Sequence, residues 1–183
     1  MRIYLDTGVF IDYLSIRGST NAILRTADRR GRALAQIAAD AERIFEKLRR
    51  PHIRATSCLS YYEVEEALYN LLSRSAKGVS HADRLLIPAA RSITTQVHAV
   101  VELFEISVLD LTPATIRIQL QQLELQTRGV RAADALHAAT AIAFDAELLI
   151  STDEALLGLD RILVNASGNK ISCRDTDQAL ALL

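Results

Sequence analysis

The sequence predicts an α/β protein in three layers, with a central, mainly parallel sheet of four to five strands covered by helices on both faces. Short apolar segments with high β propensity alternate along the chain with helical segments, and this order is typical of parallel sheets. The chain has 183 residues, about the length of one domain with a single substantial core. It contains no internal repeat, low-complexity segment or long linker, so we expect one domain over residues 1–183.

Five segments are predicted as strands. Each is short and apolar and is separated from the next by residues with a helical pattern or by turn-forming residues. The segments are RIYL at 2–5, IRATS at 53–57, EISVLDL at 105–111, ELLIS at 147–151 and RILVN at 161–165.

Helices are predicted between these strands, where apolar residues recur at helical spacing. Pro51 marks the end of one helix, while Thr112 and Pro113 give the cap and first turn of another that ends near Gly129. Besides the helix after Thr112, the predicted helices are 9–16, 33–50 (ended by Pro51), one that begins at Ser60, 81–104 with an interruption near Pro88, the alanine-rich 131–146, DEALLGL at 153–159 and DTDQALALL at 175–183.

The polar stretch 17–32 opens an extended loop–helix region at 17–50. The five arginines of the stretch 17–32 could form a phosphate-binding arm. We favour a solvated loop, because runs of charge are more often solvated. We also expect Asp12 to lie at the surface of the first helix. The arginines are Arg17, Arg25, Arg29, Arg30 and Arg32.

Composition excludes several classes of protein. The formal net charge is −1, so bulk charge does not attract nucleic acid, and any such attraction has to come from local patches. The two cysteines, Cys58 and Cys173, form no CxxC motif, which argues against a structural zinc site. There is no secretory signal and no apolar run approaching the ~20 residues that span a bilayer, so we expect a cytoplasmic protein.

Four acidic residues from distant segments are expected to meet at one edge of the sheet. Asp6 follows the first strand directly, and Asp153 lies just past the fourth. Glu63 lies in the first turn of the helix after the second strand, and Asp134 lies near the start of the helix that leads into the fourth. The carboxyl ends of parallel strands form the functional edge of such sheets. Close carboxylates repel one another, and a hard cation such as Mg²⁺ or Mn²⁺ removes that conflict.

Each acid also has a purely structural interpretation. Asp6 could cap the first helix, and Ser60 with Glu63 fits a capping box. Asp134 and Asp153 could simply favour the positive N-termini of their helices. We favour a metal site because all four positions fall on the same edge.

The residues resemble the PIN-domain nucleases, and among them the VapC-type toxins of type II toxin–antitoxin systems. The resemblance rests on YLDTGVFIDYL at 4–14, SCLSYYEVEEAL at 57–68, RAADALHAATAIAFDAELLISTDEAL at 131–156 and LVNA at 163–166. It implies a PIN-like fold and assigns Asp6, Glu63, Asp134 and Asp153 as catalytic and metal-binding residues.

The same resemblance implies an endoribonuclease that uses Mg²⁺ or Mn²⁺ to activate water, is often a homodimer and is neutralised by a cognate antitoxin. A role in RNA processing instead of a toxin role stays open. One alternative is a catalytically silent module that binds RNA or a partner. Another is an aspartyl-phosphate phosphatase, which we consider a poor match because Gly8 occupies the position of its usual second aspartate.

Four neighbouring residues complete the predicted site. Thr7 and Ser151 adjoin the acids and could hold them through second-shell hydrogen bonds, or could serve as turn and cap residues. Glu66 lies one helical turn from Glu63 and could share its face. His137 could act on substrate as an acid or base, but we expect it to pack at the edge of the core with its ring hydrogen-bonded.

Overall fold

The computed structural model describes residues 1–17, 24 and 27–183 and contains a five-stranded sheet in which every pair of neighbouring strands is parallel. The strand order is β3-β2-β1-β4-β5, which confirms the predicted α/β class. The strands are β1 (Arg2–Leu5), β2 (Ile53–Ser57), β3 (Ser107–Leu109), β4 (Leu148–Ile150) and β5 (Ser172–Arg174).

The fifth strand does not lie where the sequence predicted it. Residues 161–165 form turns and one isolated antiparallel bridge between Val164 and Lys170, and the chain reaches the sheet only at β5. Leu163 is buried, so the apolar character of this segment serves the core and not a strand. β5, with the sequence SCR, is placed by its pairing with β4 and not by its own β propensity.

The predicted helices are present, with small shifts at their ends. The helical stretch 81–104 divides at Ser92 and Ile93, whereas Pro88, where the interruption was predicted, lies inside α4 (Asp83–Arg91). Thr112 caps the next helix as predicted, and its side chain accepts a hydrogen bond of 3.2 Å from the Thr115 amide. The helices are α1 (Thr7–Arg17), α2 (Leu34–Leu48), α3 (Leu59–Ser75), α4 (Asp83–Arg91), α5 (Thr94–Leu103), α6 (Pro113–Gln121), α7 (Leu123–Thr127), α8 (Ala132–Ala143), α9 (Glu154–Leu157) and α10 (Thr176–Ala179). Among the described residues, no helix is long and apolar enough to cross a membrane.

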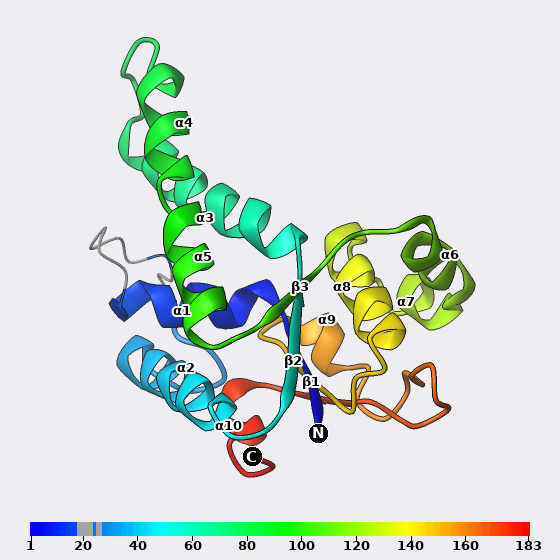
Figure 1. Cartoon of the computed structure of the whole chain (residues 1–183). Coiled ribbons are helices and arrows are strands. Elements are labelled where there is room, and N and C mark those ends of the chain that lie inside the picture. The colour runs from blue at the N-terminus through cyan, green and yellow to red at the C-terminus, as the bar shows by residue number, and fades with distance from the viewer. Residues whose placement is uncertain (18–23, 25–26) are drawn as a thin grey trace.

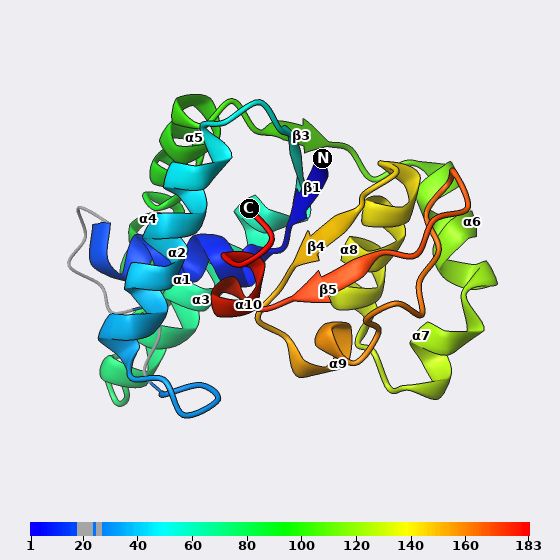
Figure 2. The ribbon, with the colours of Figure 1, turned by 90° about the horizontal axis from the view of Figure 1, so that it is seen from below.

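Two apolar cores cover the two faces of the sheet. In β1, Ile3 and Leu5 join one buried cluster while Tyr4 joins the other, because successive side chains of a strand point to opposite faces. The first cluster draws on α1, α2, α3 and α5, and the second on α7, α8 and α9. Figures 1 and 2 show these helix groups on either side of the strands, with α3 and α4 extending beyond the sheet. The three-layer prediction is confirmed.

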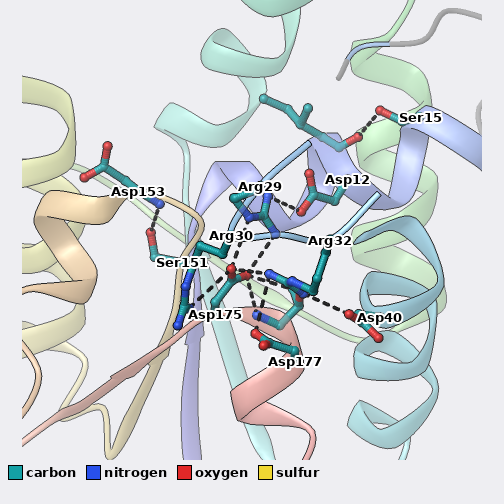
Figure 3. A network of polar contacts seen from close by, with 12 residues as sticks. Asp12, Ser15, Arg29, Arg30, Arg32, Asp40, Ser151, Asp153, Asp175 and Asp177 are labelled. Atoms are coloured by element: carbon teal, nitrogen blue, oxygen red, sulfur yellow. Dashed lines mark hydrogen bonds and ion pairs between the residues drawn. The ribbon is translucent and has the colours of Figure 1, made fainter. Parts of the chain in front are cut away.

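The arginine-rich loop is not a solvated loop throughout. The side chains of Arg29 and Arg32 are only 10% and 12% exposed, and both pair with Asp175 at the start of α10 (Figure 3). Arg29 also bonds to Asp12 at 2.8 Å, and Arg32 bonds to Asp40 of α2 at 2.8 Å. These contacts join α1, α2 and α10 through the segment between α1 and α2.

Two predictions about this region are therefore corrected. Asp12 is fully buried, because the guanidinium of Arg29 compensates its charge away from solvent. Arg29 and Arg32 are structural ion-pair partners, whereas the Arg30 side chain is 35% exposed and lies 3.6 Å from Asp175. Arg25 and the side chain of Arg17 lie outside the part of the chain that the structure describes.

The ion pairs predict a large stability difference between two neighbouring aspartates. Asp175 is fully buried, whereas the Asp177 side chain is 39% exposed and lies 3.4 Å from Arg32. Asp175→Asn leaves two nearly buried arginines undercompensated, so we expect it to lower the free energy of unfolding by about 3 kcal/mol. The matched Asp177→Asn should lower it by less than ~0.5 kcal/mol. Urea denaturation of both variants measures the difference, and equal losses would show that the arginines do not depend on Asp175.

Candidate metal centre

Asp6 is held by the pairing of β1 with β4. Its backbone N–H donates to the Ile150 carbonyl at 3.0 Å, which continues the parallel ladder past the end of β1. Its carboxylate accepts from the Thr7 amide at 2.8 Å and from the Ser151 hydroxyl at 2.7 Å. Asp6 is nearly buried, and its charge is stabilised by neutral donors from both sides of the strand pair.

Glu63 does not belong to a capping box. The N-cap position of α3 is Cys58, no side chain caps this helix, and the Ser60 hydroxyl instead lies 2.8 Å from Thr56 Oγ1. Glu63 Oε2 accepts a short hydrogen bond from the Thr7 hydroxyl and another of 2.7 Å from His137 Nε2. The carboxylates of Glu63 and Asp6 therefore lie side by side, with ligand atoms within 4.8 Å of each other.

His137 is buried and hydrogen-bonded, as predicted. Its Nδ1 lies 2.8 Å from the Tyr4 hydroxyl, and its Nε2 lies 3.6 Å from Asp6 Oδ1. Burial opposes protonation of the ring, but the carboxylates of Asp6 and Glu63 outweigh burial and raise the pKa of His137. For Glu63, burial raises the pKa, yet the hydrogen bond and charge of His137 prevail and lower it.

Asp153 both caps a helix and adjoins the site. Its Oδ1 accepts from the Ala155 and Leu156 amides at 2.8 and 3.0 Å, which starts α9. Its own amide donates to Ser151 Oγ at 3.0 Å (Figure 3). Ser151 also donates to Asp6, so it links the two acids. Asp153 thus lies at the N-terminus of α9, as its structural interpretation expected, and it caps that helix with its own side chain.

Asp134 has no hydrogen bond or ion pair among the described contacts, and His137 is the one group whose charge lowers its pKa. It lies in the first turn of α8 and is half-buried. Burial, followed by the negative charges of Asp153, Asp6 and Glu63, raises the pKa of Asp134 to about 6. Asp134 therefore lies within electrostatic range of the other three predicted acids, whereas the ligand atoms that lie within 4.8 Å of one another belong to Asp6, Glu63 and His137.

The remaining predicted neighbours divide into two groups. Thr7 donates a hydrogen bond to the Glu63 carboxylate, and Ser151 donates one to the Asp6 carboxylate. Glu66 is exposed and lines a separate hollow between α3 and α4 together with Tyr62, Tyr69 and Arg91. The structure therefore does not bring Glu66 into this group of residues.

Tyr4 is the contact that the sequence analysis missed. It lies within an apolar strand segment, where an aromatic residue is ordinarily part of the core. The alternation of β1 could have indicated its role, because Tyr4 faces α8, the helix that carries His137.

Gly8 allows the loop after β4 to pack against the start of α1. A Cβ atom at Gly8 would lie 1.9 Å from Thr152 Oγ1, so any side chain at this position would displace Thr152. The position has no room for the second aspartate of an aspartyl-phosphate phosphatase, which removes the structural basis for that alternative.

The donor chemistry of the site fits a hard divalent cation. Ligand atoms of Asp6, Glu63 and His137 lie within 4.8 Å of one another, and Asp134 adds a carboxylate whose pKa is raised by burial and by the neighbouring acids more than His137 lowers it. Mg²⁺ and Mn²⁺ prefer oxygen ligands and keep several waters, so the four carboxylates are suitable first ligands.

The raised pKa of Asp134 predicts a stability effect with a defined sign. The folded protein binds this proton more tightly than the unfolded chain, so its stability falls as pH rises from about 4 to about 6. In EDTA, we expect Asp134→Asn to raise the free energy of unfolding at pH 7.5 by about 1 kcal/mol. The full pKa shift corresponds to ~3 kcal/mol, and the expected gain is smaller because Asp134 is partly exposed to solvent. The gain should vanish at pH 4.

Urea denaturation at the two pH values, with the exposed Asp110→Asn as a control, measures this effect. A loss of stability in Asp134→Asn at both pH values would contradict the repulsion inferred among the four acids.

The fold is shared with known proteins. The chain is similar to one in the crystal structure of VapBC2 from Rickettsia felis bound to a DNA fragment from their promoter, with a TM-score of 0.53, 14% identity, and coverage of 96% of this chain and 98% of that one. At this identity, the similarity concerns the fold alone. No curated protein sequence gives a significant match. The family model described as the PIN domain matches residues 3–162, and the chain therefore belongs to the PIN domain family.

Proposed function

We propose that this protein is an endoribonuclease that requires Mg²⁺ or Mn²⁺ and hydrolyses RNA phosphodiester bonds. Membership of the PIN family, whose members are generally nucleases, supports the reaction class. The observation that supports the metal requirement is the approach of ligand atoms of Asp6, Glu63 and His137 to within 4.8 Å of one another. Burial and the charges of three neighbouring acids also raise the pKa of Asp134, which a bound cation would oppose. Asp6, Glu63, Asp134 and Asp153 are the proposed metal-binding and catalytic residues.

A bound ion of this type supplies activated water and stabilises charge on the phosphodiester. The protein contributes carboxylates that are already oriented. Thr7 and His137 hold Glu63, Ser151 holds Asp6, and the amides of α9 hold Asp153. Asp134 has no described hydrogen bond to hold it, so its oxygens are available to orient water beside the substrate phosphate.

We further propose that the nuclease is the toxin of a VapC-type toxin–antitoxin pair, acts as a homodimer and is neutralised by a cognate antitoxin. The support is the shared fold over nearly the full length of a chain from a structure named VapBC2. The antitoxin is the partner that this comparison suggests.

The nuclease proposal predicts opposite outcomes for two glutamates of α3. Glu63→Gln removes the charge beside Asp6, whereas Glu66→Gln changes an exposed residue three positions away. We expect the first change to reduce cleavage of a mixed RNA substrate by about 10²-fold or more, and the second to leave it within about twofold. EDTA should abolish wild-type cleavage, and added Mn²⁺ should restore it.

The assay also separates the proposal from its alternative. Wild-type protein that binds Mn²⁺ and RNA but releases no fragments would be a catalytically silent module. Equal cleavage by the wild type and Glu63→Gln would contradict the assigned site.

The toxin role predicts an effect on growth that depends on the same acids. Induced expression in a bacterial host should arrest growth, and Asp6→Asn should relieve the arrest at equal protein levels, because Asp6 lies at the centre of the site. Co-expression of a short DNA-binding protein encoded beside the gene should also relieve it. Light scattering of the purified protein measures whether it is a dimer. Undisturbed growth with active nuclease would favour RNA processing over a toxin role.

A further inference from the structure

A chain of hydrogen bonds runs from the buried core into the candidate metal centre. It begins at the Tyr4 hydroxyl, passes through both ring nitrogens of His137 and ends at Glu63 Oε2. The contacts measure 2.8 Å and 2.7 Å, and both Tyr4 and His137 are fully buried. His137, which contacts Glu63, is thus hydrogen-bonded to Tyr4, which lies in the buried core.

The direction of the last hydrogen bond follows from elementary chemistry. An ionised carboxylate only accepts hydrogen bonds, so Nε2 of His137 carries a proton and donates it to Glu63. This holds whether the ring is neutral or charged. At the other nitrogen, the Tyr4 hydroxyl can donate or accept, and it therefore satisfies Nδ1 in either state. Both edges of the ring are fixed by partners.

The two oxygens of Glu63 are not equivalent. Oε2 accepts from both His137 and the Thr7 hydroxyl, while none of the contacts among the described residues involves Oε1. A glutamate side chain without such contacts would sample several rotamers and would have to be ordered when an ion binds. Here one oxygen is anchored and the other is left for a ligand.

His137 Nε2 also lies close enough to Asp6 and Glu63 to be a metal ligand itself. Two observations argue against that role. The nitrogen is already committed to Glu63 at 2.7 Å, and the ring is fully buried behind the carboxylates. In addition, the cations that suit this site prefer oxygen to imidazole nitrogen.

We infer that His137, held by Tyr4, is a positioning residue that anchors Glu63 Oε2 so that Oε1 can bind a divalent cation. This inference rests on the proposed metal-dependent function and adds to it the residue that prepares one ligand. His137 contacts neither ion nor substrate in this arrangement. Its contribution is the fixed orientation of Glu63 before the ion arrives.

Two amide substitutions at His137 test the inference. In His137→Gln, the side-chain amide reaches the position of Nε2 and can still donate to Glu63. In His137→Asn, the amide reaches only the position of Nδ1 and leaves Glu63 without this donor. Titration calorimetry with Mn²⁺ should show binding about 10- to 100-fold weaker for His137→Asn and within about threefold of wild type for His137→Gln.

The same change at an exposed histidine provides the control. His98 of α5 pairs with Glu102 at 3.1 Å, and its side chain is 62% exposed. His98→Asn should bind Mn²⁺ as the wild type does. Circular dichroism confirms that each variant is folded at the temperature of the titration.

Three results would overturn the inference. One is equal Mn²⁺ affinity in wild type and folded His137→Asn, and another is equally weak binding in both amide variants, which would indicate a role in packing alone. The third is a ¹⁴N coupling from bound imidazole in pulsed electron paramagnetic resonance of the Mn²⁺-loaded wild type, which would make His137 a ligand. Absence of Mn²⁺ binding by the wild type would instead refute the proposed function, and this inference with it.

Discussion

The parallel pairing of β1 with β4 fixes the positions from which the candidate site is built. The register sets Leu5 opposite Ile150, and the next amide, that of Asp6, continues the ladder. The two chains leave the sheet side by side, so the hydroxyl of Ser151 reaches Asp6 directly. Glu63 and Asp134 approach the same edge from helices on opposite faces of the sheet. A shift of one residue in this register would turn Tyr4 and Leu5 toward the wrong cores and separate Asp6 from Ser151.

The protein treats its buried acids in two different ways. Asp12, Asp40 and Asp175 are each paired with an arginine, and together they tie helices from both ends of the sequence. The acids at the sheet edge have no arginine partner among the described contacts and are held by hydroxyls, amides and one histidine. Hydroxyls and amides orient a carboxylate without cancelling its charge, and His137 is the one group at this edge whose protonation would add a positive charge. This difference in compensation separates a structural group of acids from one that suits a cation.

Much of this arrangement could be predicted because it follows from local patterns and from topology. Apolar runs mark four of the strands, and the parallel order sends Asp6 and Asp153 to one edge. The fifth strand could not be predicted, since RILVN has higher β propensity than SCR and only tertiary pairing selects the latter. Nor could the arginine pairs, because Arg29 and Asp175 lie 146 residues apart in the sequence. Composition alone describes the segment around Arg29 as a solvated loop.

The central position of β1 has a kinetic consequence. Asp6 and Ser151 are separated by 145 residues, and β1 and β2 have both been synthesised long before β4. Contacts that close such long loops form slowly, because the entropy of the intervening chain is lost before the contact gives anything in return. A nascent chain that stops short of β4 therefore lacks one strand neighbour of β1, the Ser151 hydroxyl that bonds to Asp6, and Asp153. Any nuclease activity of this protein would begin only after nearly the whole domain had been translated.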